Sequence, residues 1–330
     1  MKVLVTGGAG VVGSYVVREL VESGEKPVVM DAAPLPPHLA AEFGDRIEFH
    51  QFDIGELSPL LHLLLKHKIE AVIHLAALTG TAPDDYPLLK FRVNAAGTMN
   101  VLEAARLTGV RRVLFASTRT VYPDFRGTRH GPPDYEPVPE EHWTDVVRPY
   151  EVWKLAGERM GEFYQRQFGL DWVAFRFAVY YAAERVIRHG QEHAMGRLHT
   201  LMARAIQGVA LSQPSGADHP MDIVYVKDLA GIMALALRAK TLPHTVYNAG
   251  SGTTVQVRQI VQAIKSVLPG AKLDIGSGAD FAPGGWRSCL IDISRAKADL
   301  GFSPAWPVEK GIEDCIRRTQ DLVNAGFRIP

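Results

Sequence analysis

Tyr150 and Lys154 stand four residues apart in a stretch with helical patterning. On a helix, residues i and i+4 share one face, so the lysine ammonium group would lie beside the tyrosine phenol. The pKa of a free tyrosine is about 10, and a nearby positive charge lowers the pKa of a phenol. The pair could therefore exchange a proton with an alcohol near neutral pH. The spacing alone is weak evidence, because a packed tyrosine and a solvated lysine produce it by chance.

Glycines at positions 7, 10 and 13 form a second pattern within the segment Thr6-Gly7-Gly8-Ala9-Gly10-Val11-Val12-Gly13. An apolar run precedes it at residues 2–6, and residues 11–23 have helical patterning. Glycine permits a tight turn and close approach of the backbone to a pyrophosphate, which the amino end of the next helix attracts. This order predicts a dinucleotide-binding motif. We expect the cofactor to contact Gly7, Gly10, Val11, Val12 and Gly13.

Asp31 ends the next apolar run, at residues 27–31. A carboxylate in this position can accept hydrogen bonds from the adenosine ribose and would repel a 2′-phosphate. No basic residue follows directly, since the next residues are Ala32, Ala33 and Pro34. The sequence therefore favours NAD over NADP.

Short apolar runs alternate with amphipathic stretches in the first half of the chain. This alternation predicts a doubly wound parallel α/β sheet of the Rossmann type, and strands apolar throughout are expected when helices cover both faces. We predict strands at residues 2–6, 27–31, 47–51, 71–75, 112–117 and 172–177, and helices at 11–23, 56–67, 85–108 and 151–168.

Beyond residue 177 the alternation becomes irregular. We predict helices at residues 195–207, 227–239, 255–267 and 308–323, with short strands at 246–248 and 273–275. Residues 1–177 would form the cofactor-binding domain with the Tyr150 helix, regaining elements from about 221–250, and residues 178–330 would form mainly a smaller substrate lobe. The proline-rich segment 123–149 should be a long loop.

The composition excludes several classes of partner. Lysine and arginine total 36, as do aspartate and glutamate, so no net charge attracts nucleic acid or an anionic membrane. The two cysteines, Cys289 and Cys315, lack metal-binding spacing and form no disulfide framework. No apolar run is long enough for a membrane span, and the amino terminus lacks signal-peptide features. We expect a cytoplasmic protein.

Further motifs make the chain resemble an extended short-chain dehydrogenase/reductase of the NAD-dependent epimerase/dehydratase family. They cover nearly the whole chain in the family's order. Besides the glycine motif, Asp31 and the Tyr150–Lys154 pair, they are Asp53-Ile54, His74-Leu75-Ala76-Ala77, Asn94-Ala95-Ala96-Gly97-Thr98, Ser117-Thr118-Arg119-Thr120-Val121-Tyr122, Tyr247-Asn248-Ala249-Gly250-Ser251-Gly252 and Asp292-Ile293-Ser294-Arg295-Ala296-Lys297.

The resemblance implies a role for each matched position. Asp53 and Ile54 would hold the adenine, and Leu75, Ala76 and Ala77 would line the cofactor. Asn94 would support the site. Thr118 would be the catalytic hydroxyl residue, with Ser117 as the alternative if the alignment shifts by one. Tyr150 and Lys154 would complete the catalytic set and contact the cofactor. The helices at 85–108 and 151–168 match those that form the family's dimer.

The chain also departs from the family pattern. Arg119 and Thr120 replace the Asp-Glu pair of sugar-nucleotide dehydratases, which argues against dehydration. The usual asparagine is missing from the segment Arg176–Tyr180, and Met221 replaces an arginine that binds a substrate diphosphate in nucleotide-sugar members. A buried diphosphate without charged partners would be costly. These losses favour a smaller substrate, such as a free sugar, a sugar acid or a hydroxy acid.

Several basic residues could bind a carboxylate, because the guanidinium fork matches it. We single out Arg119, Arg185 and Arg287 for the substrate, with Ser117, and note Arg126 and Arg129 in the long loop. His189 and His193 have helical spacing, but no supporting motif accompanies them, and we expect no metal.

Three functions remain open from the sequence. A dehydrogenase would oxidise a secondary alcohol and release NADH. An epimerase of a sugar or nucleotide sugar would use the same residues and return the hydride to the other face. A redox sensor would bind the dinucleotide without chemistry, but retention of Thr118, Tyr150 and Lys154 argues against it.

Overall fold

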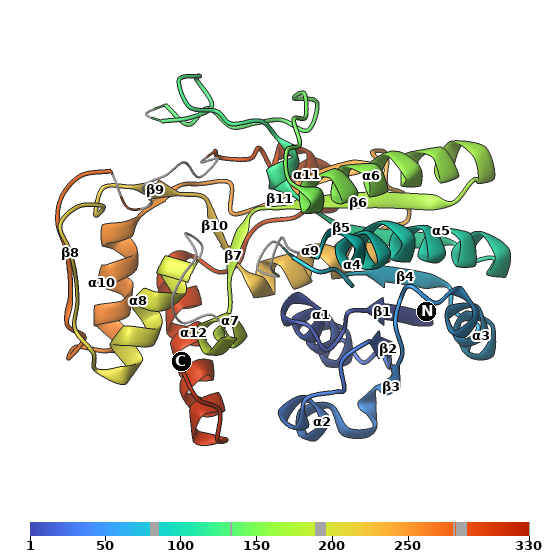
Figure 1. The fold of residues 1–330 in the computed structure, drawn as a ribbon, viewed down its shortest axis with the longest axis horizontal. Coiled ribbons are helices and arrows are strands. Elements are labelled where there is room, and N and C mark those ends of the chain that lie inside the picture. The colour runs from blue at the N-terminus through green and yellow to red at the C-terminus, as the bar shows by residue number, and fades with distance from the viewer. Residues whose placement is uncertain (80–85, 133, 189–195, 280, 282–288, 330) are drawn as a thin grey trace.

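The computed structural model describes the chain except residues 80–85, 133, 189–195, 280, 282–288 and 330. A parallel sheet with strand order β11-β6-β5-β4-β1-β2-β3 forms its centre (Figure 1). The doubly wound fold predicted from the sequence is confirmed. The strands are β1 (Val3–Thr6), β2 (Val28–Asp31), β3 (Glu48–Gln51), β4 (Ala71–His74), β5 (Arg112–Thr118), β6 (Asp171–Phe177) and β11 (Val246–Ala249).

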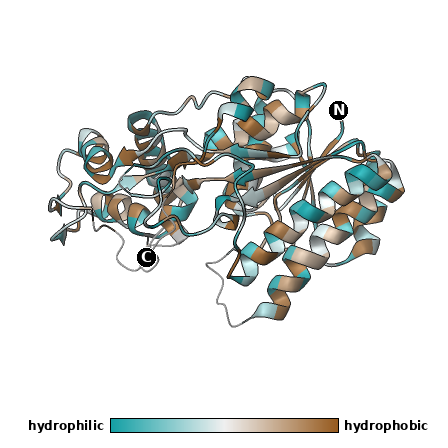
Figure 2. Cartoon of the chain, turned by 90° about the horizontal axis from the view of Figure 1, so that it is seen from above, coloured by the Kyte–Doolittle hydropathy of each residue, from teal (hydrophilic) through white to brown (hydrophobic). Residues whose placement is uncertain are grey.

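Helices cover both faces of this sheet, which explains why its strands are apolar throughout. Successive strand residues point to opposite faces, so Leu4 packs in one core cluster while Val3 and Val5 pack in the other. Figure 2 shows the strands as a brown centre between helices of mixed colour. The helices of this half are α1 (Val11–Glu22), α2 (Pro37–Phe43), the 3-10 turn η1 (Gly44–Arg46), α3 (Leu57–His67), α5 (Gly97–Thr108), α6 (Pro149–Phe168) and α9 (Val226–Arg238).

The helix expected over residues 85–108 is not uniform. It comprises α4 (Pro87–Lys90), a π-helical segment η2 (Phe91–Ala96) and α5. A π turn adds one residue to the helical repeat and is frequent at functional sites. Here it carries Asn94, whose side chain reaches the segment after β4.

The C-terminal part contains elements that the sequence pattern did not reveal. Three small sheets pair β7 with β10, β9 with β12 and β8 with β13. Of these strands only β13 matches a predicted one, at residues 273–275, and the others are too short for periodicity to show. The predicted helices at 195–207, 255–267 and 308–323 correspond to α8, α10 and α12. The elements of this part are β7 (Val179–Tyr181), α7 (Ala183–Arg188), α8 (Gly196–Gln207), β8 (Leu211–Gln213), β9 (Pro220–Met221), β10 (Ile223–Tyr225), β12 (Val255–Gln256), α10 (Val257–Val267), β13 (Leu273–Ile275), α11 (Ser294–Leu300) and α12 (Val308–Asn324).

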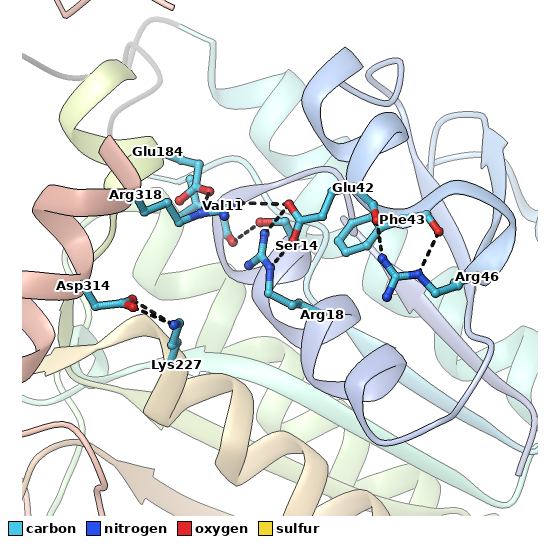
Figure 3. Close-up of polar contacts among 10 residues, drawn as sticks. All are labelled: Val11, Ser14, Arg18, Glu42, Phe43, Arg46, Glu184, Lys227, Asp314 and Arg318. Carbon is cyan, nitrogen blue, oxygen red and sulfur yellow. Dashed lines mark hydrogen bonds and ion pairs between the residues drawn. The ribbon is translucent and has the colours of Figure 1, made fainter. Parts of the chain in front are cut away.

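Charged side chains join this lobe to the cofactor half. Arg318 on α12 donates to Glu184 on α7 at 2.9 Å and to Glu42 on α2 at 3.2 Å. Glu42 also pairs with Arg18 on α1 (Figure 3). These partners lie far apart in the chain, so the cluster fixes α7 relative to the first helices of the sheet.

The proline-rich segment after the 3-10 turn η3 (Arg119–Val121) is the expected long loop. In Figure 1 it is the green chain that runs past the sheet near α11. Val138 forms an isolated parallel bridge with Ile291, and its carbonyl accepts from the Asn248 side chain at 3.0 Å. The loop is therefore attached to the late part of the chain.

Among the described residues, no helix combines the length and apolar character needed to cross a bilayer.

Candidate active site at the carboxyl edge of the sheet

The glycine motif forms a close turn between β1 and α1. Gly7 has a φ of +70°, and a Cβ there would lie 2.6 Å from the Ala76 backbone nitrogen. A Cβ on Gly13 would lie 2.1 Å from the Gly7 carbonyl oxygen. Side chains at both positions are therefore excluded. Helix α1 begins at Val11 with no capping side chain and no acidic residue in its first turn. Its free N–H groups and positive dipole end suit a pyrophosphate.

Asp31 lies at the end of β2, next to this turn. Its carboxylate accepts from the Ala9 backbone nitrogen at 3.1 Å and from the Ala33 nitrogen at 3.0 Å. These bonds hold the side chain beside the glycine turn, in the position suited to a ribose diol. The turn, the open helix end and the carboxylate together fit NAD.

Asp53 and Ile54 follow β3 at the same edge of the sheet. Asp53 accepts from the Gly55 nitrogen at 2.8 Å and pairs with Arg92 at 3.0 Å. Ile54 is buried, and its carbonyl accepts from the Asn100 side chain at 3.0 Å. The segment is thus fixed in place near the predicted adenine position.

A buried polar network orders the segment after β4. His74 is fully buried between the hydroxyls of Thr6 at 2.7 Å and Thr98 at 3.1 Å. Burial lowers the pKa of His74 to about 3, with a smaller contribution from Lys154, so the ring is neutral. The Thr6 hydroxyl also accepts from the Ala76 nitrogen at 3.3 Å. This network shapes the turn of residues 75–77, predicted to line the cofactor.

Asn94 pins the same segment from the π-helical turn. Its Oδ1 accepts from the Leu78 nitrogen and its Nδ2 donates to the Leu78 carbonyl, each at 2.8 Å. The Asn94 side chain thereby bonds both backbone groups of Leu78, as a neighbouring strand would. Its described contacts match a supporting role.

Thr118, Tyr150 and Lys154 come together where β5 meets α6. Pro149 is the first residue of α6, so Tyr150 stands in the first turn and Lys154 one turn later. The Lys154 ammonium donates to the Ala116 carbonyl at 2.6 Å and lies 5.8 Å from the centre of the Tyr150 ring. The Thr118 side chain hydrogen-bonds the Tyr150 phenol. The helical spacing has therefore placed the two groups on one face.

The pKa of Tyr150 departs from the expectation. It is raised above the usual value, first by burial of the phenol and second by Tyr180, while Arg185 and the Thr118 hydrogen bond lower it. The lowering expected from the neighbouring Lys154 ammonium is therefore outweighed by burial of the phenol. Burial also lowers the pKa of Lys154, to about 7, against the opposing effect of Glu158. Near neutral pH the lysine thus exists in both protonation states.

Ser117 is turned away from Tyr150. Its hydroxyl donates to Glu158 at 2.5 Å, and Glu158 binds Arg176 through two bonds of 2.7 and 3.0 Å. All three side chains are buried. The structure does not place Ser117 with the reacting groups, and it favours Thr118 as the hydroxyl residue. The reason is strand geometry, because adjacent residues of β5 face opposite sides.

Arg119 is also occupied elsewhere. Its Nη1 donates to the Cys289 carbonyl at 2.9 Å. Its charge opposes the rise in the pKa of buried Asp222, which burial brings to about 6. The sequence-based assignment of Arg119 to substrate is therefore not supported by its contacts, which link the η3 turn to the C-terminal lobe. Arg287, His189 and His193 lie outside the described residues.

Arg185 does lie near the reacting groups, on α7. It is 6% exposed, donates to the Tyr180 hydroxyl at 2.9 Å, and its guanidinium carbon lies 4.1 Å from the centre of that ring. Tyr180 was not predicted as a site residue. Its effect on the pKa of Tyr150 places it beside the site, and the three-residue strand that carries it has no readable period.

One group with metal-ligating side chains occurs among the described residues. The ligand atoms of Glu48, His50 and His67 lie within 4.8 Å of one another, with Glu48 Oε1 3.1 Å from His50 Nε2 and 3.3 Å from His67 Nε2. Glu48 begins β3 and His67 ends α3. Both positions are at the amino edge of the sheet, opposite Tyr150.

The fold and the site define a class of protein: an NAD-dependent enzyme of the extended short-chain dehydrogenase/reductase type. The comparisons with known proteins agree. The model of the NAD dependent epimerase/dehydratase family matches residues 3–250, and the chain belongs to this family.

Relatives extend the similarity over almost the whole chain. UDP-glucose 4-epimerase of Mus musculus is 32% identical, and the match covers 99% of this chain and 98% of the relative. Among solved structures, UDP-glucose 4-epimerase of Thermotoga maritima with UDP-glucose has a TM-score of 0.82 at 25% identity, covering 98% of this chain and 100% of that one. The enzyme of Thermus thermophilus in complex with NAD has a TM-score of 0.77 at 26% identity, covering 97% and 99%. The cofactor is NAD.

Proposed function

We propose that this protein is an NAD-dependent epimerase that inverts a secondary-alcohol carbon of a sugar, with Tyr150 as the acid/base. The observation that supports this proposal most directly is the placement of Thr118 and Lys154 beside the Tyr150 phenol. Similarity to UDP-glucose 4-epimerases over 99% of the chain supports it and makes a nucleotide-linked sugar the first substrate to test. The sequence had favoured net oxidation, and the relatives favour the alternative.

The chain's residues would perform the proton transfer as follows. Thr118 hydrogen-bonds the substrate hydroxyl and orients its proton toward the Tyr150 phenolate oxygen. Bound NAD would supply the reversible hydride acceptor for the same carbon. Tyr150 takes the proton as the C–H bond breaks, leaving a ketone, and gives it back when hydride returns to the opposite face. Lys154, anchored on the Ala116 carbonyl, would in its protonated form oppose the burial that raises the pKa of Tyr150 and so favour the phenolate.

The cofactor would be held mainly by backbone. In this proposal the turn of Gly7, Gly10 and Gly13, with Val11 and Val12, cradles the pyrophosphate. Asp31 binds the adenosine ribose. The remaining contacts come from the segments after β3 and β4, namely Asp53, Ile54, Leu75, Ala76 and Ala77, with Asn94 behind them and with Tyr150 and Lys154 near the nicotinamide ribose.

A second candidate function is net oxidation of a free sugar acid or hydroxy acid. Val179 on β7 and Met221 on β9 favour it, because both are apolar where nucleotide-sugar enzymes have polar groups. The register pairs Val179 with Ile223, two residues after Met221, so the two apolar side chains border the same region. A diphosphate there would lack charged partners from these positions.

The deciding experiment incubates the purified protein with NAD and UDP-glucose, UDP-galactose, free hexoses, uronates and small hydroxy acids. NADH is followed by absorbance and stereoisomers by NMR. A new stereoisomer without NADH accumulation supports the epimerase, whereas stoichiometric NADH supports the dehydrogenase. Tyr150→Phe should lower kcat about 1000-fold, in the middle of the range for general acid–base catalysis, and leave NAD affinity intact. Unchanged turnover in Tyr150→Phe would contradict both.

The chain also presents the surface expected of a dimer. Large apolar side chains are exposed along the run from α4 to α5 and on α6: Tyr86, Leu88, Leu89, Phe91, Leu107, Phe163 and Phe168. A contiguous exposed apolar face marks an interaction surface. We propose a homodimer through these helices. Leu88→Glu with Phe163→Glu should yield a monomer in sedimentation velocity, while Leu65→Glu, on exposed α3, should not. A wild-type monomer would refute it.

A further inference from the structure

The candidate arginines differ in how their charge is balanced. Arg126 is exposed and pairs with Asp124, and Arg129 is exposed and pairs with Glu136 at 3.2 Å. Arg119 is buried against the Cys289 carbonyl and faces Asp222. Arg185 is buried as deeply, yet it forms no ion pair with any residue that the structure describes.

The acid next to Arg185 in the chain is already bound. Glu184 accepts from Arg318 at 2.9 Å, as Figure 3 shows, so it does not neutralise Arg185. Within the described residues, the only hydrogen bond of the Arg185 guanidinium group is the one to the Tyr180 hydroxyl. A guanidinium group has five N–H donors. An unbalanced buried charge is costly, and a bound anion would remove that cost.

Tyr180 fixes the direction of the guanidinium. The ring lies against its face at 4.1 Å while the hydroxyl accepts one N–H, a combination that holds the planar group at two points. Thr118 pairs with Phe177 in the β5–β6 register, and Tyr180 follows three residues later. The Tyr180–Arg185 pair therefore borders the Thr118–Tyr150 site, and both of its members influence the pKa of Tyr150.

We propose that Arg185, oriented by Tyr180, binds a carboxylate of the substrate close to the carbon that exchanges hydride, so that the substrate is a sugar acid or a related hydroxy acid. This inference rests on the proposed function for the identity of the reacting carbon. A carboxylate fits because it matches one guanidinium fork bidentately. A diphosphate carries more charge than a carboxylate, and the apolar side chains of Val179 and Met221 cannot donate hydrogen bonds to it.

The test uses substrates that differ only in the acidic group. UDP-glucose is compared with UDP-glucuronate, and galactose with galacturonate, for the NAD-loaded wild type and for Arg185→Met, Arg185→Lys and Tyr180→Phe. We expect wild type to prefer the acid of a pair. Arg185→Met should lower the ratio of kcat/KM for the acid to kcat/KM for the neutral sugar about 100-fold, as for loss of a charged bidentate bond. Arg126→Met is the matched control and should not change this ratio.

Several outcomes would overturn the inference. One is equal or better turnover of the neutral sugar by wild type. Another is an equal loss on UDP-glucose and UDP-glucuronate in Arg185→Met, which would assign the arginine to the diphosphate. NAD titration and thermal unfolding of each variant exclude misfolding as the cause of a loss.

Failure of the proposed function would be visible separately. If no sugar is turned over, equilibrium binding of galacturonate and UDP-glucuronate to the NAD-loaded protein is measured. Binding that is weakened in Arg185→Met but not in Arg126→Met supports the anion site at Arg185, while the absence of turnover contradicts the proposed reaction. Equal binding in both variants rejects the anion site.

Discussion

Two buried arginines flank the Tyr150 site, and their surroundings differ. On the β6–α6 side, Arg176 is bound bidentately by Glu158, and its Nη1 donates to the Glu140 carbonyl at 3.0 Å. On the β7–α7 side, the Arg185 guanidinium has, among the described residues, one hydrogen bond, to the Tyr180 hydroxyl. A buried charge balanced by the protein stabilises a fixed structure, whereas one left unbalanced is available to a ligand. The first region is therefore structural and the second is suited to binding.

Breaking the ion pair between Arg176 and Glu158 should produce the largest loss of stability. Arg176→Met leaves Glu158 buried without its partner, and we expect the free energy of unfolding to fall by about 3–5 kcal/mol. Chemical denaturation followed by circular dichroism measures this. Arg159→Met, which removes an exposed pair with Glu162 on the same helix, should change it by less than about 0.5 kcal/mol. Equal effects would show that the Arg176 region is not structural.

The adjacent residues Ser117 and Thr118 separate structure from catalysis within one strand. Thr118→Val removes the hydroxyl beside Tyr150 and should lower kcat about 100-fold with little change in stability. Ser117→Ala removes the bond to Glu158 and should lower stability by about 1–2 kcal/mol with a smaller effect on kcat. Steady-state kinetics and unfolding are measured on both. The reverse pattern would reassign the catalytic hydroxyl to Ser117.

His74 should make stability depend on pH on the cofactor side of the site. The ring stays neutral in the folded protein down to pH about 3, whereas in the unfolded chain it binds a proton below about 6.5. Stability should therefore fall as the pH is lowered through that window, by up to about 1.4 kcal/mol per pH unit. His74→Gln should show a shallower decline between pH 5.5 and 4.5. Parallel curves would show that other groups cause the decline.

Removing the Arg185 side chain should have the smallest effect on stability. Arg185→Met exchanges a buried charge that has no acidic partner in the described part of the chain for an apolar side chain, so the free energy of unfolding should change by less than about 1 kcal/mol. Thermal unfolding beside Arg176→Met makes the comparison direct. A loss as large as that of Arg176→Met would mean that Arg185 is structural too.

The sequence by itself determined the cofactor half of the molecule. The glycine turn, Asp31 and the alternating strands act through local chain geometry: a glycine is required where a Cβ would strike the backbone, and a strand buried on both faces must be apolar throughout. The same holds for Tyr150 and Lys154, since helical spacing alone puts them on one face. These features were readable because each depends on residues close together in the chain.

Only the tertiary structure decided which polar groups are available for binding. Ser117 and Arg119 were plausible substrate ligands by residue type, but Glu158 and Cys289 engage them from elements far along the chain. Arg185 became distinctive because Arg318, from the last helix, binds the neighbouring Glu184. The pKa of Tyr150 likewise depends on burial and on Tyr180, which no local spacing encodes. Charge balance and burial are properties of packed elements, so they are set only when the chain has folded.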